Sequence, residues 1–220
     1  MRKIDLALLI GLIVAVAVSN FTSFEQSYES LQNGVLRLHV LANSDSDEDQ
    51  ELKLKVRDRI LEYSSEIFGE DLNIDEVEDR VKQKLDRIKE IADEVIKENG
   101  FSYSVECEFV NMNFTAREYE ELTMPAGNYD ALRVTIGKAE GKNWWCVMYP
   151  PLCIPATTIK EASDDGDGEG LDDSKTIITA KNGDEFFSEE EYEIMEKPER
   201  YKVKFKILEI YDGIKKKISS

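Results

Sequence analysis

Apolar and polar positions alternate most regularly between residues 35 and 42 of this 220-residue chain. One face of the predicted strand holds the apolar side chains of Leu36, Leu38, Val40 and Ala42. The other face holds Arg37, His39 and Leu41, because successive side chains of a strand point to opposite sides. The pattern therefore predicts a strand with one core face and one face of mixed polarity.

A polar turn and an amphipathic helix are expected directly after this strand. Asn43 to Ser46 offer side-chain oxygens to the unpaired amides of a helix start, and Asp49 follows Ser46 at the spacing of a capping box. We expect the helix to begin near Asp47 and to carry acids in its first turn and bases later, the order that the helix dipole favours. Its apolar stripe is made of Leu52, Val56, Ile60 and Tyr63.

A longer helix and three more strands complete the pattern. Apolar residues recur at steps of three and four from about Asp75 to Glu98, and Gly100 supplies a left-handed helix end. Alternating runs predict strands over Phe101–Asn113, Tyr129–Ile136 and Trp144–Tyr149, with a loop or irregular hairpin around Pro125. The turn at residues 137–143 favours antiparallel pairing of the last two strands.

These elements predict an α+β fold, an antiparallel sheet of about four strands packed against two or three helices. The length suffices for a sizeable core, so residues 34–220 are expected to form a single domain. The last segment, residues 201–217, is compatible with a strand or a helix. We favour the helix, whose apolar stripe would be Phe205, Leu208, Tyr211 and Ile214.

The first 19 residues have the layout of a secretory signal. Arg2 and Lys3 precede an uncharged run from Leu6 to Val18, and small residues precede a possible cleavage after Ser19. This run is shorter than the ~20 apolar residues of a spanning helix, so a cleaved signal is favoured over an uncleaved anchor, and both interpretations remain open. Either one places the folded part outside the cytoplasm. Residues 20–33 are polar with scattered aromatics and are expected to be a tether.

The formal net charge of −18 argues against nucleic acid as a partner and against adhesion to anionic lipid, so membrane contact is expected only through the N-terminal segment. Acids concentrate in residues 161–173, which we expect to be a flexible insert. A calcium-loop pattern begins there with Asp165, Asp167 and Glu169 before Gly170. It fails at Thr176, where a bidentate acid should stand, so the flexible insert is preferred to a calcium-loaded adhesin.

The three cysteines lie after the N-terminal segment. Cys107 falls in the apolar phase of its strand and is expected to be a small buried thiol. Cys146 and Cys153 bracket the pair Pro150–Pro151, which stiffens a turn. We prefer a disulfide between them, as suits an oxidising compartment, to two unpaired core cysteines or half of a metal site.

Candidate catalytic chemistry is sparse. His39 is the only histidine in the sequence, which excludes the usual zinc-protease and zinc-finger patterns, and its simplest interpretation is a partly buried histidine beside a carboxylate. The sequence contains no glycine-rich phosphate loop and no aspartic-protease motif. We expect no catalytic residue, metal or cofactor. The alternative kept open is an exported hydrolase or metal-binding domain that uses His39, Asp45 and Asp49.

Several separate words of the sequence support a more specific hypothesis. They are LRLHVLANSDSDEDQELKLKVRD from Leu36, GNYDALRVTIG at Gly127–Gly137 and NWWCVMYPPLC at Asn143–Cys153, with a weaker KFKILEI near the C-terminus. In this order the words resemble the stage II sporulation protein R family, over about residues 34–155. The resemblance implies export from the forespore into the space between the two sporulation membranes. It also implies activation of a membrane-embedded aspartic protease of the mother cell that processes pro-sigma-E.

Polar and aromatic side chains in the matching words make a candidate contact surface, since loops and polar sheet faces present groups to a partner without a deep pocket. The candidate partner-binding residues are Arg37, His39, Asn43, Ser44, Asp45, Asp49, Gln50, Lys53, Arg57, Arg133, Trp144 and Trp145. Polar residues at a turn also serve as helix caps, and both tryptophans are compatible with core packing, so structural roles remain open.

Overall fold

The computed structural model describes residues 3–68, 72–119, 122–152, 186–208 and 210. Within these ranges four strands form the main sheet in the order β2-β5-β1-β6. The strands are β1 (Leu36–Leu41), β2 (Val105–Phe114), β5 (Gly127–Ile136) and β6 (Asn143–Tyr149). Two pairings are antiparallel and the β1–β5 pairing is parallel. The predicted α+β fold with a four-stranded, mostly antiparallel sheet is confirmed.

The expected pairing of β5 with β6 is wrong, because β1 lies between them. Leu38 is aligned with Leu132 of β5 on one side and with Cys146 of β6 on the other. Five of the six residues of β1 are buried. A strand so thoroughly buried has to be covered on both faces and paired on both edges, which outweighs the local tendency of β5 and β6 to form a hairpin.

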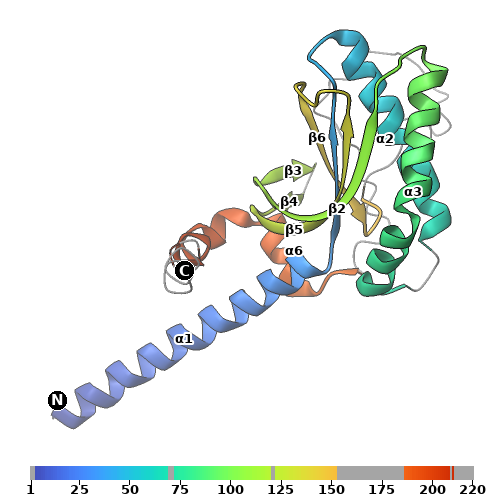
Figure 1. Ribbon diagram of the computed structural model, residues 1–220. Helices are drawn as coiled ribbons and strands as arrows, with labels where there is room; N and C mark the ends of the chain where they lie inside the picture. Colours follow the sequence, from blue (N-terminus) through green and yellow to red (C-terminus); the bar gives the residue numbers. More distant parts are fainter. Residues whose placement is uncertain (1–2, 69–71, 120–121, 153–185, 209, 211–220) are drawn as a thin grey trace, which may run out of the picture.

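Two helices cover one face of the sheet, α2 (Asp47–Ile67) and α3 (Ile74–Glu98) (Figure 1). Helix α2 begins where the capping pattern predicts, and Ser46 accepts a hydrogen bond from the amide of Asp49. Helix α3, expected from about Asp75, begins at Ile74, where Asn73 forms a full capping box with Glu76 that the sequence analysis did not identify. The core between helices and sheet includes Leu36, Leu38, Val40, Leu52, Val56, Ile60, Val81, Ile88, Val95, Leu132 and Val134. The core face predicted for the first strand is therefore confirmed.

The opposite face of the sheet is also buried, which the sequence analysis did not anticipate. It is covered by the C-terminal part of α1 (Lys3–Asn33), by the short hairpin of β3 (Arg117–Tyr119) and β4 (Leu122–Met124), and by α6 (Glu189–Glu196). This second core includes Phe24, Leu31, Phe114, Tyr119, Met124, Tyr129, Val147, Ile194 and Met195. The face of β1 that carries Arg37 and His39 is thus an interior face.

Residues 20–33 are not a tether, because they continue α1 and pack against this second core. Phe24 is 4% exposed and Leu31 is 0% exposed, and Tyr28 packs beside them. These three residues follow one another at steps of four and three, so they share one face of the helix. The scattered aromatics of this segment are therefore an amphipathic pattern that is too short to stand out from its polar neighbours.

The C-terminal region is helical where it is described. A 3-10 turn, η1 (Pro198–Tyr201), leads into helical residues 202–208, as the helix interpretation predicted. Helix α6 was missed, although Ser188 and Glu191 form a capping box at its start. The acidic insert at residues 161–173 and its calcium-like motif lie outside the described residues.

Candidate functional site

The turn after β1 and the connection from β5 to β6 meet at one end of the sheet (Figure 1). We call residues 43–50 and 137–143 together the rim. Two backbone hydrogen bonds join the β5–β6 connection to the turn after β1. The amide of Glu140 donates to the carbonyl of Asn43 at 3.2 Å, and the amide of Gly141 donates to the carbonyl of Ala42, the residue before the rim, at 3.1 Å. The rim is therefore one closed unit and not two independent loops.

Asn43 is the central side chain of the rim. Its Oδ1 accepts a hydrogen bond from the amide of Lys138 at 3.0 Å, and its Nδ2 donates to Oδ2 of Asp49 at 2.8 Å. Ser44 Oγ donates to the same carboxylate oxygen at 2.5 Å. Burial alone would raise the pKa of Asp49, but hydrogen bonds from Ser44, Asn43 and Tyr103 outweigh it, so that the pKa is lowered. Asp49 is thus held as a charged acceptor inside the turn.

Three more predicted residues are brought to the same place. The amide of Lys142 donates to Oδ1 of Asp45 at 2.6 Å, and Nε2 of Gln50 donates to the carbonyl of Ser44 at 2.8 Å. Lys53 is buried, and its Nζ donates to Oε1 of Gln50 at 2.6 Å. The structure therefore brings these side chains together, and each of them already has a partner within the rim.

Two glycines that the sequence analysis passed over make the rim possible. Gly137 has a φ of 57°, and a Cβ at that position would lie 2.3 Å from Oδ1 of Asn43. A Cβ at Gly141 would lie 2.2 Å from the carbonyl oxygen of Ser44. The sequence could have pointed to them only as two glycines four residues apart in a predicted turn. Their contacts, Asn43 and Ser44, lie almost a hundred residues away, and the sequence does not indicate them.

The side chains on the outside of the rim are accessible to a partner. The exposed residues are Asp45, Ser46, Asp47, Glu48, Lys138, Glu140, Lys142 and Asn143. They combine a compact acidic group at the start of α2 with two lysines on the β5–β6 connection. Asn43 and Asp49 support this surface from beneath, so the accessible residues are Asp45, which the sequence favoured, and neighbours of the other favoured residues.

Arg37 is not accessible, which corrects its expected place on a contact surface. Its side chain is 0% exposed, and its guanidinium carbon lies 4.5 Å from the ring centre of Phe114 and 5.1 Å from that of Tyr129. Nε donates to the carbonyl of Cys146 at 3.1 Å, and Nη2 donates to the hydroxyl of Tyr119 at 2.8 Å. Burial lowers the pKa of Arg37. The guanidinium is a structural cation enclosed by aromatic rings.

His39 is likewise interior and 4% exposed. Its ring stacks on Trp145 with centroids 3.9 Å apart, and Nε2 lies 3.1 Å from Oδ1 of Asn143. The expected neighbouring carboxylate is therefore a carboxamide. Burial lowers the pKa of His39, Arg133 lowers it further, and the contact with Asn143 opposes both. Asp45 and Asp49 have the rim partners described above, so the proposed group of His39, Asp45 and Asp49 does not form a hydrogen-bonded unit.

The remaining predicted residues have structural contacts. The guanidinium of Arg57 stacks 4.2 Å from the ring centre of Trp144 and pairs with Asp58 at 2.6 Å. Trp144 packs against the core on the helix side, and Trp145 packs on the opposite side. Arg133 pairs with Glu108 on the neighbouring strand at 2.6 Å.

The part of the chain that the structure describes offers little support for a metal site or a reactive thiol. No group of three potential metal ligands occurs among these residues. Cys107 is a free thiol packed against the core, and burial raises its pKa to about 12. Cys146 is buried in β6, but Cys153 lies outside the described residues, so the disulfide stays a prediction.

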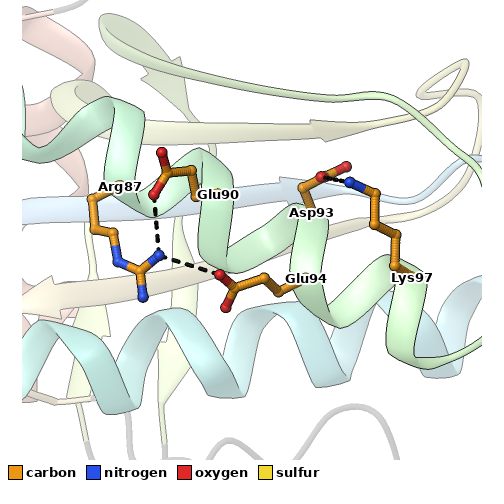
Figure 2. A network of polar contacts seen from close by, with 5 residues as sticks. All are labelled: Arg87, Glu90, Asp93, Glu94 and Lys97. Carbon is orange, nitrogen blue, oxygen red and sulfur yellow. Dashed lines mark hydrogen bonds and ion pairs between the residues drawn. The ribbon is translucent and has the colours of Figure 1, made fainter.

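The outer face of α3 provides a contrasting surface (Figure 2). Arg87 forms ion pairs with Glu90 at 3.1 Å and Glu94 at 3.2 Å, and Lys97 pairs with Asp93. Such exposed pairs within one helix contribute only tenths of a kcal/mol each, about 0.3–0.5 in typical cases. The charged side chains of this face pair mainly with one another, and it is a suitable control surface for substitutions in the rim.

Comparisons with known proteins agree on one group. Residues 32–159 match the family model described as stage II sporulation protein R. The chain is also 34% identical over 119 residues to "Stage II sporulation protein R" of Bacillus subtilis (strain 168), which covers 54% of this chain and 53% of that protein. The chain thus spans about half the length of the curated relative it matches. No solved structure matches. The matched residues include the sheet, α2, α3 and the entire rim.

Proposed function

The chain belongs to the stage II sporulation protein R family, which gives it a role in sporulation, and we propose that it is an exported signal that activates a protease by contact. The receptor in this proposal is a membrane-embedded aspartic protease of the mother cell, which processes pro-sigma-E. The observation that carries the proposal is the family match over residues 32–159.

Export is supported by the first half of α1. From Leu6 to Val16 the helix is uncharged and exposed, and α1 is long and apolar enough to cross a membrane. Arg2 and Lys3 precede it, and positive charge before an apolar helix favours a cytoplasmic N-terminus with the rest of the chain outside. The folded domain would then lie between the forespore and mother-cell membranes.

The position of the rim supports a role in contact with a protein on a facing membrane. Helix α1 leads directly into the first residue of β1, and the rim follows the last residue of β1. Six residues of strand span roughly 20 Å, at about 3.3 Å per residue. The rim thus lies at the end of the sheet away from α1 (Figure 1). A domain attached through α1 would present the rim away from its own membrane.

Activation by contact requires that the rim bind one state of the protease better than another. A ligand shifts such an equilibrium only by its difference in affinity for the two states. The exposed charges of Asp45, Asp47, Glu48, Lys138 and Lys142 supply interactions that depend on the geometry of the partner. Because the side chains beneath hold the rim in one conformation, little ordering is needed when it binds.

The experiment that tests the proposal is capture of the protease by the tagged full chain from detergent extracts of sporulating cells. Asp47→Asn with Glu48→Gln removes two exposed rim charges at nearly constant shape. Asp79→Asn with Asp86→Asn removes two exposed charges from α3 and serves as the matched control. We expect capture by the native chain and by the control, and weaker capture by the rim variant. Absence of the protease from all captures overturns the proposal, and equal capture by both variants overturns the assignment to the rim.

A further inference from the structure

The exposed half of α1 ends where a second exposed apolar surface begins. Residues 4–16 and 18 of α1 are exposed, and the helix projects from the domain as one straight rod (Figure 1). From Phe21 onward the same helix packs against the second core. The boundary between its free and packed parts therefore lies near Asn20.

The free part is long enough to remain in a bilayer. Ile4 to Asn20 is 17 residues by position in the sequence, and at 1.5 Å per residue it spans about 26 Å, close to the ~30 Å of a hydrocarbon core. The possible cleavage point after Ser19 lies within continuous helix, where Nδ2 of Asn20 donates to the carbonyl of Val16 at 3.0 Å. Proteolysis favours exposed, irregular segments, so a peptide bond in the middle of a helix is a poor substrate.

The C-terminal helical segment crosses α1 at this boundary. Nζ of Lys204 donates to the carbonyl of Asn20 at 3.4 Å and lies 5.1 Å from the ring centre of Phe24. The rings of Phe24 and Phe205 meet edge to face at 5.2 Å. The segment is therefore positioned directly beyond the apolar part of α1, at the level where a bilayer crossed by α1 would end.

The segment has two opposite apolar faces. Tyr201, Phe205 and Leu208 pack against the second core. Val203, Ile207 and Ile210 follow at steps of four and three, so they share the face that points away from the core. Their exposed fractions are 73%, 46% and 56%. A second apolar stripe that no described residue covers is unusual on a chain with a formal net charge of −18.

Lysines border the exposed stripe on both sides. Lys202 and Lys206 lie on one side of it and Lys204 on the other, by their positions on a helix of 3.6 residues per turn. Lys202 also pairs with Glu199. An apolar stripe flanked by lysines is typical of helices that lie in a membrane interface, where the stripe enters the acyl boundary and the ammonium groups reach lipid phosphates.

We infer that α1 stays in the bilayer and that the helical residues 202–208 and 210 lie in the interface of the same bilayer, against anionic phospholipid headgroups. The domain then has two attachments to its own membrane, and the orientation of the rim is fixed. This extends the expectation that only the N-terminal segment touches the membrane. The negative charge of the whole chain does not decide the matter, because residues 202–210 themselves carry three lysines and a single acid, Glu209.

The test uses the full chain reconstituted in vesicles of phosphatidylglycerol and phosphatidylcholine. An environment-sensitive fluorescent amino acid replaces Leu12, Val203 or, as a control on the far face of α3, Asp86. Nitroxide quenchers are attached to lipids either near the headgroup or deep in the acyl chain. We expect the probe at position 12 to lose emission with the deep quencher and the probe at 203 with the headgroup quencher. The probe at 86 should lose emission with neither.

Charge dependence gives a second readout at position 203. Replacing phosphatidylglycerol with phosphatidylcholine, or introducing Lys202→Gln with Lys206→Gln, should reduce quenching at 203 and leave quenching at 12 unchanged. If the probe at 203 behaves like the probe at 86, the interfacial helix is wrong. If the probe at 12 is not quenched, the retained anchor is wrong. Shielding of the probe at 203 that grows only with protein density would indicate a second copy and overturn the lipid contact. None of these outcomes depends on capture of the protease.

Discussion

Asn43 and Gly137 lie 94 positions apart in the sequence but are in close contact, because Oδ1 of Asn43 fills the space that a side chain at position 137 would need. A Cβ at position 137 would lie only 2.3 Å from that oxygen, and Gly137 also has a φ of 57°. The end of β5 is thereby bound to the turn after β1. The shape of the whole rim depends on this pair, because Asn43 also holds Asp49.

Gly137→Ala should destabilise the domain for two reasons, backbone strain and collision with Asn43. We expect a loss of about 2–4 kcal/mol in the free energy of unfolding. Gly100→Ala is the control, because its φ of 81° gives the same kind of strain but no atom lies within 4 Å of its Cβ. It should cost only about 1–2 kcal/mol. Urea unfolding of both variants in mild detergent measures the difference, and equal losses would show that the contact with Asn43 is unimportant.

The lowered pKa of Asp49 predicts a specific loss of stability in acid. Because the pKa is lower in the folded than in the unfolded chain, its contribution is present above the unfolded value and is lost as pH falls through the folded one. Asp49→Asn should therefore have a lower free energy of unfolding than the native chain at pH 7. This difference, the stability gap, should narrow below about pH 4. Asp86→Asn, which replaces an exposed acid on α3, should leave a gap near zero at both pH values. A constant gap for Asp49→Asn would show that the charge of Asp49 contributes nothing.

Arg37 should matter for packing and not for partner contact. Arg37→Met fills a similar volume and removes a buried charge, for which the described residues offer no carboxylate partner, so it should lose no more than about 2 kcal/mol. Arg37→Ala leaves a cavity among Phe114, Tyr119 and Tyr129 and should lose about 3–5 kcal/mol. Urea unfolding gives the two values. The folded Arg37→Met variant should still capture the protease, and loss of capture by it would restore Arg37 as a contact residue.

The three cysteines should differ sharply in reactivity. Cys107 is partly buried and its pKa is raised to about 12, so it should remain a thiol that reacts much more slowly with iodoacetamide in the folded chain than after unfolding. Cys146 and Cys153 should be joined when the exported chain is mapped by peptides without reduction, and a loop of this size stabilises by roughly 2.5 kcal/mol. Peptides in which Cys146 and Cys153 are both alkylated before reduction would exclude the disulfide.

The sequence predicted the elements better than their arrangement. Caps and periodicity located α2, α3 and the four strands of the main sheet because those signals are local. The central place of β1 could not be predicted, since it depends on pairing with strands about a hundred residues away. The two polar residues Arg37 and His39 suggested an exposed face, and only the aromatic residues gathered from β2, β5 and β6 explain why that face is buried.

The rim was predicted only in part, because half of it depends on contacts between distant parts of the sequence. Its first half, residues 43–50, is continuous in sequence, so Asn43, Ser44, Asp45 and Asp49 were identified together as a turn and helix start. Its second half belongs to another connection, and the contribution of Gly137 and Gly141 becomes visible only when the two turns meet. The exposed neighbours Asp47 and Glu48 were interpreted solely as a helix start, because their position beside Lys138 and Lys142 is a tertiary feature.

Processing of pro-sigma-E in vesicles that contain the candidate protease tests the central claim most directly. Full-length chain is reconstituted in a second population of vesicles and added as the native form, as the rim variant Asp47→Asn with Glu48→Gln, or as the α3 control Asp79→Asn with Asp86→Asn. We predict that processing depends on added chain, that the control restores it, and that the rim variant restores much less. Processing that is equally fast without the chain, or cleavage of pro-sigma-E by the chain alone, would contradict an activator that works by contact.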